Sequence, residues 1–265
     1  MKKITGLFVA MLLLLSSCGS VPLTGRKQVL LVSDQEVLSS SLTQYSDYMK
    51  SAKKSSSKDG AAMVTRVGKR IAAATEQYLK NNGLESEVKN FSWEFNLVKD
   101  PQVNAFCMPG GKIVVYEGLM QLVSSDDELA VVIGHEVAHA VAKHSNERMS
   151  QQLMAQYGAQ ILGQALSNKS AAVQQIGTSV YGLGAQYGVM LPFSRKHESE
   201  ADYMGLVFMA MAGYNPEVAV NFWQKMSAGK SGSTPEFMST HPSDATRINE
   251  IKQHLPEIEK YKVKR

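Results

Sequence analysis

Residues 125–144 read SDDELAVVIGHEVAHAVAKH, and this stretch decides the fold. Ser125 and Glu128 match a capping box, which predicts that a helix begins here with acidic side chains in its first turn. The positions that follow are apolar nearly all the way round a helix, apart from one glutamate and two histidines. A helix with that pattern is buried. The sequence therefore predicts a buried helix that runs to His144 and carries three polar side chains in its middle.

The three polar side chains are those of His135, Glu136 and His139. Residues four apart share one face of a helix, with Cβ atoms about 5–6 Å apart, so both imidazoles can bind one Zn²⁺. Glu136 lies on the flank of that face, where its carboxylate reaches a metal-bound water without binding the metal, as in an H-E-x-x-H motif. A solvated helix is the alternative, but burying these three groups without a partner is costly. The pattern predicts a zinc site with Glu136 as catalytic base.

A third metal ligand is expected on another helix. Zinc peptidases that extend the motif with a glycine and a third histidine would need them at Ala142 and Ser145, so that class is excluded. The helix predicted over 194–211 carries Glu198 and Asp202 at positions i and i+4. We interpret Glu198 as the ligand. Asp202, one turn further on, is expected to accept the free N–H of a ligating histidine and to fix its tautomer.

Three nearby residues receive structural interpretations. Glu200 points away from Glu198 round the same helix, so it is not expected at the metal. His144 lies on a different face from the two ligand histidines. Cys107 is the only cysteine besides Cys18, which excludes a disulfide framework and favours a small apolar residue in a strand.

The remaining pattern predicts an α+β fold that is mostly helical, with a small, mainly antiparallel sheet beside the metal-binding helix. Caps and breakers place the helices, and alternation between short turns places the strands. The other expected helices are 34–49, 61–82, a hairpin over 149–187 broken near residue 167, 194–211, one beginning at residues 215–216, and a short one after residue 243. The expected strands are 29–32, 93–98, 103–107 and 112–116.

The N-terminus has the pattern of a secretion signal. Two lysines precede an apolar run, Leu7–Leu15, that is too short to span a bilayer comfortably. Small residues then precede Cys18, as in a bacterial lipobox. We therefore interpret residues 1–17 as a lipoprotein signal peptide and Cys18 as the lipidated residue of a tether over 18–27. An ordinary signal peptide cleaved near Ser17 is the alternative. Acyl chains would anchor the chain stably, because each buried methylene adds about 0.8 kcal/mol.

Two function classes are excluded by charge and motif. The formal net charge is +4 before the two N-terminal lysines are removed, which is too small and too scattered for a nucleic-acid surface. Gly229-Lys230-Ser231 invites a nucleotide-binding interpretation, but the upstream glycine of a phosphate-binding loop would be residue 224, which is Gln224. Neither nucleic acid nor nucleotide is expected as a partner.

Five motifs, in order along the chain, carry a family resemblance. They are Pro22-Leu-Thr-Gly-Arg26, Asn104-Ala-Phe-Cys-Met-Pro-Gly-Gly111, His135-Glu-Val-Ala-His139, Ser194-Arg-Lys-His-Glu-Ser-Glu-Ala-Asp202, and His241-Pro242 with Arg247-Ile248. The set resembles the gluzincin family of the HtpX heat-shock protease and the CaaX prenyl endopeptidase. Within that family it is most similar to bacterial lipoproteins of the LoiP and BepA type and to the mitochondrial inner-membrane stress protease.

The resemblance implies a membrane-anchored zinc metalloendopeptidase over residues 28–265, with one zinc ion per chain held by the two histidines and Glu198. The expected reaction is metal-assisted hydrolysis of peptide bonds in unfolded or misassembled envelope proteins, as in protein quality control. One alternative is a metal-stabilised chaperone or assembly factor that holds such proteins without cutting them. The intact Glu136 argues against it, since a site without catalysis has no need of that carboxylate. A non-peptidase zinc hydrolase is a second alternative.

Three further roles are open. In this family the histidine that matches His241 can approach the metal, as a plug or as a transition-state donor, whereas a loop histidine is the alternative. Arg247 could steady an oxyanion or the aspartate behind the metal ligand, or form only a surface ion pair. Asn104, Ala105 and Phe106 could form a sheet edge that binds substrate by β-addition, or a plain core strand.

The expected location is a bacterial cell envelope, with the chain lipid-anchored at the outer membrane and facing the periplasm. An aspartate directly after the lipidated cysteine would favour the inner membrane, and Gly19 stands there instead. The expected partners are polypeptide substrates and, through the lipid on Cys18, a membrane.

Overall fold

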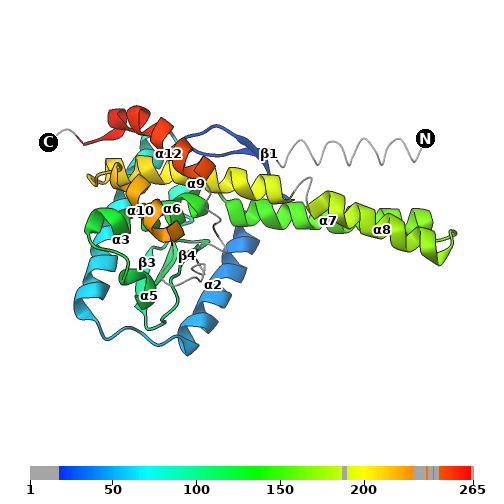
Figure 1. Ribbon diagram of the computed structural model, residues 1–265, viewed down its shortest axis with the longest axis horizontal. Helices are drawn as coiled ribbons and strands as arrows, with labels where there is room; N and C mark the ends of the chain where they lie inside the picture. Colours follow the sequence, from blue (N-terminus) through cyan, green and yellow to red (C-terminus); the bar gives the residue numbers. More distant parts are fainter. Residues whose placement is uncertain (1–17, 187–189, 229–236, 238–240, 242–244, 264–265) are drawn as a thin grey trace.

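The computed structural model describes residues 18–186, 190–228, 237, 241 and 245–263. They form a mostly helical body with a small sheet, and a pair of long helices projects from that body (Figure 1). One strand of the sheet contacts the histidine-bearing helix. The predicted α+β class is confirmed.

The helices of the described part, in chain order, are α2 Asp34–Ser51, α3 Lys58–Asn81, α4 Glu85–Val88, α5 Glu117–Met120, α6 Asp126–Val141, α7 His144–Leu166, α8 Ala171–Ala185, α9 Leu191–Met211, α10 Val218–Ala228, α12 Ala245–Ile258 and the 3₁₀ helix η2 Glu259–Tyr261. The strands are β1 Cys18–Ser20, β2 Lys27–Val29, β3 Glu94–Val98, β4 Ala105–Met108 and β5 Lys112–Tyr116.

The main sheet has three strands in the order β3-β5-β4. β4 and β5 form an antiparallel hairpin, whose turn has Gly110 and Gly111 at φ of 91° and 81°, a conformation that glycine adopts readily. β3 pairs in parallel with β5, so β5 is central and buried along its length. A separate antiparallel pair joins β1 and β2. Two of these three pairings are antiparallel, as expected. The parallel pairing of β3 with β5 was not predicted. The alternation of residues within a strand does not reveal which strand of the β4–β5 hairpin lies beside β3.

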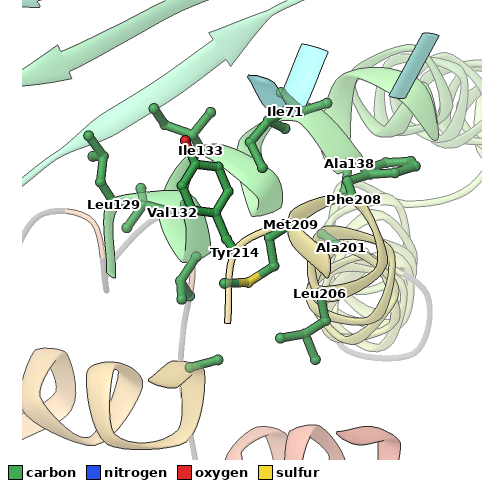
Figure 2. Packing of buried hydrophobic residues seen from close by; sticks show 14 of the residues in the cluster. Ile71, Leu129, Val132, Ile133, Ala138, Ala201, Leu206, Phe208, Met209 and Tyr214 are labelled. Carbon is green, nitrogen blue, oxygen red and sulfur yellow. The ribbon is translucent and has the colours of Figure 1, made fainter. Parts of the chain in front are cut away.

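Helices α6 and α9 cross at the centre of the core, where their buried side chains pack together (Figure 2). Gly134 and Gly205 allow the two backbones to touch. A Cβ atom on Gly205 would lie 2.8 Å from the backbone nitrogen of His135, and one on Gly134 would lie 2.9 Å from the carbonyl oxygen of Gly205. Ile71 of α3, which is fully buried, packs over the same crossing (Figure 2). This close approach sets the middle of α6 against α9.

α6 is shorter than predicted. It ends at Val141 instead of His144, because Lys143 takes a left-handed conformation with φ of 56°. The ammonium group of Lys143 is held by carboxylate oxygens of Asp34, at 2.6 Å, and Glu87, at 2.8 Å. α7 begins at His144, and the bend turns this imidazole back toward the last turns of α6.

α7 and α8 form the predicted helical hairpin, with a break between Leu166 and Ala171 (Figure 1). The hairpin carries large apolar side chains in solvent, among them Ile161, Ile176 and Val180, whose exposed fractions are 68%, 64% and 64%. Among the residues with assigned positions, no helix combines the length and the hydropathy needed to cross a bilayer.

Other boundaries differ by a few residues from those expected. β2 ends at Val29, whereas a strand was expected over 29–32. α10 begins at Val218, because the side-chain oxygen of Asn215 accepts a hydrogen bond from the backbone N–H of Glu217 and holds a turn there. The segment of the rejected nucleotide-binding motif, from residue 229, lies outside the described residues.

Candidate metal centre

Four side chains converge where α6 meets α9. His135 and His139 come from α6, Glu198 comes from α9, and His241 comes from the segment after α10. Their ligand atoms all lie within 4.8 Å of one another. The first three residues are buried, and 14% of the His241 side chain is exposed. The structure thus brings together the three ligands that the sequence singled out, with His241 as a fourth group.

The spacing of these atoms is close to that of ligands round a tetrahedral metal ion, and mostly a few tenths of an ångström shorter. Nε2 of His135 lies 3.0 Å from Nε2 of His139 and 3.2 Å from Nδ1 of His241. Oε2 of Glu198 lies 3.3 Å from Nε2 of His135 and 3.0 Å from Nδ1 of His241. Ligands bound to tetrahedral zinc at about 2.0–2.2 Å are separated by roughly 3.3–3.6 Å. Imidazole nitrogens with a carboxylate oxygen are a ligand set that zinc accepts.

The electrostatics of the cluster also suit a cation. Burial lowers the pKa of His139 well below its usual value, so this imidazole is neutral. Burial acts in the same direction on His135, but hydrogen bonds to Asp202 and Glu198 outweigh it and raise the pKa of His135 to about 9. Burial alone would raise the pKa of Glu198, but the neighbouring histidines lower it, so the carboxylate is ionised. Oε1 of Glu198 is buried and has no hydrogen-bond donor among the described residues.

His135 is oriented from behind by Asp202. Nδ1 of His135 lies 2.9 Å from Oδ1 of Asp202, which is one helical turn beyond Glu198 on α9. Arg247 of α12 donates to both carboxylate oxygens of Asp202, at 2.8 Å each. Arg247 is only 5% exposed, so its contacts are those of a buried ion pair. Of the alternatives considered for Arg247, the structure therefore shows the contact with Asp202 and not an ion pair at the surface.

Glu136 lies beside the cluster. Its Oε2 accepts a hydrogen bond from the backbone N–H of Cys107 in β4, at 3.0 Å. Its Oε1 lies 3.5 Å from Nε2 of His241 and has no hydrogen-bond donor in the described part of the chain. Burial raises the pKa of the Glu136 carboxyl. A carboxyl with a raised pKa can both accept and return a proton near neutral pH.

Among the described residues β4 lies at the edge of its sheet, and the outer side of the strand faces the cluster. Just before β4, the carbonyl of Val103 accepts a hydrogen bond from the N–H of Phe237, at 3.0 Å. The carbonyl oxygen of Asn104 accepts a hydrogen bond from β5, at 3.0 Å. Antiparallel pairs alternate between bonded and unbonded residues, so Phe106 also bonds to β5, whereas the backbone groups of Ala105 and Cys107 point to the outer edge. There the N–H of Ala105 donates to the side-chain oxygen of Asn104, at 2.9 Å, and that of Cys107 donates to Glu136. The structure thus places Ala105 and Phe106, but not Asn104, in a strand at the edge of the described sheet.

A polar network behind His139 was missed by the sequence analysis. It contains Arg26, His144, Glu147, His197 and Glu200, which belong to three separate segments of the chain. Glu200 does point away from the cluster, as expected, but it is 8% exposed and ion-paired. Two signals could have revealed the network: the motif that ends in Arg26, and the density of ionisable residues in α7 and α9 next to buried helices.

The buried His-Glu-x-x-His helix, a glutamate from a second helix and an adjacent edge strand define a metallopeptidase centre of the gluzincin type. The chain belongs to Peptidase family M48, whose sequence profile matches residues 64–255, a range that includes every residue of the cluster. This match confirms the resemblance to the HtpX and CaaX endopeptidase family.

Curated relatives agree with the family. The chain is 36% identical to the mitochondrial metalloendopeptidase OMA1 of Schizosaccharomyces pombe over 205 residues, which cover 74% of this chain and 53% of that protein. It is 40% identical to the Arabidopsis thaliana mitochondrial metalloendopeptidase OMA1 over 174 residues, or 66% and 34% of the two chains. It is 32% identical to the beta-barrel assembly-enhancing protease of Yersinia pestis over 174 residues, which cover 61% of this chain and 36% of that protein. The chain therefore spans about half or less of the length of these relatives.

The expected location, at a bacterial outer membrane facing the periplasm, is wrong by this comparison. Relatives with mitochondrial names occur in yeasts, a plant and animals, and they point to mitochondria instead. The expectation rested on a short N-terminal pattern of charge, apolar run and cysteine. Such a pattern belongs to a targeting segment, which is not constrained by packing in the folded protein. It is therefore a weak guide to the compartment.

Proposed function

We propose that the chain is a zinc metalloendopeptidase that cleaves unfolded or misassembled polypeptides. In this proposal His135, His139 and Glu198 hold the zinc ion, and Glu136 is the general base. The supporting observation is convergence: the ligand atoms lie within 4.8 Å of one another at the crossing of α6 and α9, and the Glu136 carboxylate lies beside them. Membership of a peptidase family supports the same reaction class.

The chain's own residues supply the proton transfers. When bound, zinc polarises a peptide carbonyl and lowers the pKa of a coordinated water. Glu136 accepts a proton from the attacking water at Oε1, while the Cys107 N–H holds Oε2 in place. The same carboxyl then donates that proton to the leaving amine nitrogen. Burial raises the pKa of Glu136, which favours the protonated form from which the carboxyl returns the proton.

Asp202 and Arg247 act as positioning residues in this scheme. Asp202 accepts the Nδ1–H of His135 and leaves Nε2 free to bind the metal. Burial alone would raise the pKa of Asp202, but the Arg247 guanidinium lowers it and keeps the carboxylate ionised. A fixed, ionised acceptor preserves one tautomer of the ligand.

His241 is proposed to plug the site in the resting chain. Its Nδ1 lies at hydrogen-bond distance from both Glu198 and His135, where a fourth ligand would be. The Phe237 ring stacks on the imidazole, with 4.5 Å between ring centroids and 21° between planes. A substrate carbonyl or a water molecule must displace this imidazole before hydrolysis begins.

The substrate class follows from the open edge of β4. An extended peptide that adds there is recognised chiefly by backbone hydrogen bonds, which depend little on its sequence. Only an unfolded segment can present its backbone in this way, so we propose unfolded chains as substrates. We also retain the proposal that Cys18 carries a lipid and that residues 1–17 are removed, with residues 28–265 as the peptidase domain.

The competing proposal is a metal-stabilised chaperone that holds unfolded chains without cutting them. Both proposals need the metal ligands, but only the peptidase needs Glu136. The test is therefore cleavage of casein by the wild type, by Glu136→Gln and by the wild type with a chelator. We expect Glu136→Gln to bind zinc normally and to lose at least about 100-fold in rate.

The matched control is Glu257→Gln, which changes an exposed carboxylate of α12 that accepts hydrogen bonds from Tyr203 and Lys260. It should cleave casein at the wild-type rate. Cleavage that persists in Glu136→Gln would remove the assigned base. A wild type that prevents casein aggregation without cutting it would favour the chaperone.

A further inference from the structure

Both histidines of α6 have their second ring nitrogen occupied by a protein partner. For His135 the partner is the carboxylate of Asp202. For His139 the partner is another histidine: Nδ1 of His139 lies 2.8 Å from Nδ1 of His144. Nε2 of His144 then lies 3.0 Å from Oε2 of Glu200. A chain of two hydrogen bonds thus runs from His139 to a buried carboxylate.

The direction of these hydrogen bonds follows from the ligand role of His139. Nε2 of His139 faces the other ligand atoms, 3.0 Å from His135 and 3.5 Å from Glu198. A neutral imidazole that binds a metal through Nε2 carries its proton on Nδ1. His139 therefore donates to Nδ1 of His144, and His144 in turn donates from Nε2 to Glu200. Each imidazole is fixed in one tautomer as long as the side chain of Glu200 stays in place to accept the hydrogen bond.

Arg26 holds Glu200 in place. This arginine lies in the loop between β1 and β2, 174 residues before Glu200 in the sequence. Its Nε donates to Oε2 of Glu200 at 2.8 Å, and its two terminal nitrogens donate to the two carboxylate oxygens of Glu147, at 2.9 and 2.7 Å. All three guanidinium nitrogens thus bind carboxylates from α7 and α9. Such bidentate, charge-assisted contacts are strong and directional.

The rest of the network keeps His144 and the loop rigid. His197 donates from Nε2 to Glu147, at 2.9 Å, and its ring stacks on His144 with 4.2 Å between centroids. The loop is closed by a backbone hydrogen bond from Val21 to the carbonyl of Arg26, at 2.8 Å, and Val21 is 1% exposed. Arg26 is therefore presented by a docked loop and not by a free tail.

We propose that Arg26 is a positioning residue for the metal centre: through Glu200 and His144 it fixes the orientation and tautomer of the ligand His139. The affinity for zinc then depends on whether the β1–β2 loop is docked. This inference rests on the proposed zinc site, and it joins the N-terminal segment of the chain to the metal. Residues that support metal ligands from outside typically change metal affinity by 10–100-fold when they are replaced.

A purely structural role is the competing account. Arg26 could simply attach the loop to α7 and α9, in which case its loss would lower stability and leave the metal affinity of the folded protein unchanged. The two accounts differ in the zinc dissociation constant, measured by competition with a chromogenic chelator at a temperature where every variant is folded. This readout does not depend on activity.

The first comparison uses two arginines. Arg26→Met removes the guanidinium of the proposed positioning residue. Arg70→Met is the matched control, because Arg70 also attaches to the end of α9, donating to the carbonyl of Ala212 at 2.6 Å and stacking over Tyr214, but contacts neither histidine of α6. We expect Arg26→Met to raise the zinc dissociation constant 10- to 100-fold. Arg70→Met should change it by less than about twofold.

The second comparison covers the case in which Arg26→Met does not fold. His144→Leu removes the acceptor for the His139 Nδ1–H. His144→Asn keeps an acceptor, since the asparagine Oδ1 lies close to where Nδ1 of histidine lies. We expect His144→Leu to weaken zinc binding 10- to 100-fold. His144→Asn keeps the acceptor for His139 but loses the donor to Glu200, so its zinc affinity should lie between those of His144→Leu and the wild type.

Two results would overturn the inference. One is a folded Arg26→Met with the wild-type zinc affinity. The other is equal affinity in His144→Leu, His144→Asn and the wild type. A wild type that binds no zinc at all would overturn the proposed metal site. The wild-type measurement alone therefore separates failure of the metal site from failure of the role of Arg26.

Discussion

Gly205 of α9 lies so close to α6 that a Cβ atom on it would come within 2.8 Å of the backbone nitrogen of His135. The obstacle is backbone and cannot rotate away. Gly205→Ala should therefore push α9 from α6 and separate Glu198 from the two histidines. We expect a loss of about 1–3 kcal/mol in the free energy of unfolding, together with weaker zinc binding. Urea unfolding and chelator competition measure the two effects.

Gly163→Ala is the control for this prediction. Gly163 lies in α7, and a Cβ atom there would meet nothing within 4 Å. Alanine in an open helical position should stabilise the protein by about 0.4–1 kcal/mol and leave zinc binding unchanged. If both alanine variants bind zinc equally well, the glycine contact does not set the geometry of the metal centre.

The open edge of β4 supplies a second prediction. The backbone N–H of Ala105 lies on that edge, where it donates to the side-chain oxygen of Asn104 at 2.9 Å, whereas the N–H of Phe106 faces β5. A substrate strand would take the place of the Asn104 side chain. In Ala105→Pro this donor is lost both to the substrate and to the Asn104 side chain, but no hydrogen bond within the sheet is lost. We expect the KM for casein to rise about 3- to 10-fold, because one hydrogen bond contributes about 0.5–1.5 kcal/mol. The melting temperature should fall less than in a variant that breaks the sheet, because the lost N–H bonds only to the Asn104 side chain, although Ala105 itself is buried.

Phe106→Pro is the counterpart. It removes a hydrogen bond inside the sheet and leaves a buried carbonyl of β5 without its donor, which costs about 1–3 kcal/mol. Thermal unfolding should therefore separate the two variants. Equal KM values for Ala105→Pro and the wild type would show that substrate does not add to this edge.

The core of the site was predictable because its signals are local. The capping box and the apolar pattern placed α6, and the spacing of the two histidines and of Glu198 and Asp202 gave one face on each of two helices. These are the same residues that the structure brings within contact distance. The resemblance to known peptidases added His241, whose segment has no periodic pattern of its own.

The residues that were missed depend on long-range contacts. Arg26 meets Glu147 across 121 residues and Glu200 across 174 residues, and no local pattern encodes such pairs. The early end of α6 has the same origin. Lys143 adopts a positive φ, which is uncommon for residues other than glycine. Its side chain is held there by Asp34 and Glu87, which come from distant segments.

The position of His241 predicts a change in basal activity. If its imidazole occupies the fourth ligand position, then His241→Ala should cleave a short peptide at least about threefold faster than the wild type, because a larger fraction of the protein is open. Zinc should still bind, since three ligands remain. Turnover slowed by about two orders of magnitude or more would indicate instead that His241 stabilises the transition state.

Phe237→Leu tests how the plug is held. It removes the aromatic ring that stacks on His241 but keeps a large apolar side chain against Trp223. We expect a smaller rise in peptide cleavage than in His241→Ala. A variant with the wild-type rate would mean that stacking does not hold the imidazole in place.

The Arg26 network also predicts how stability depends on pH. Burial alone would raise the pKa of Glu147, but hydrogen bonds from Arg26 and His197 prevail and lower it to about 2. The unfolded chain has a carboxyl pKa near 4.5, so the unfolded state binds the proton more readily than the folded state. The stabilisation from Glu147 is therefore fully present above about pH 5 and is lost as the pH falls toward 2. The upper limit of this stabilisation is about 3 kcal/mol.

The measurement is urea unfolding of the wild type and Glu147→Gln at pH 7, 4 and 3. The difference between their free energies of unfolding should shrink with each step toward lower pH. Glu85→Gln, at an exposed position of α4, should differ little from the wild type at every pH. A difference for Glu147→Gln that stayed constant or grew on acidification would contradict the ion pair that joins the N-terminal loop to α7.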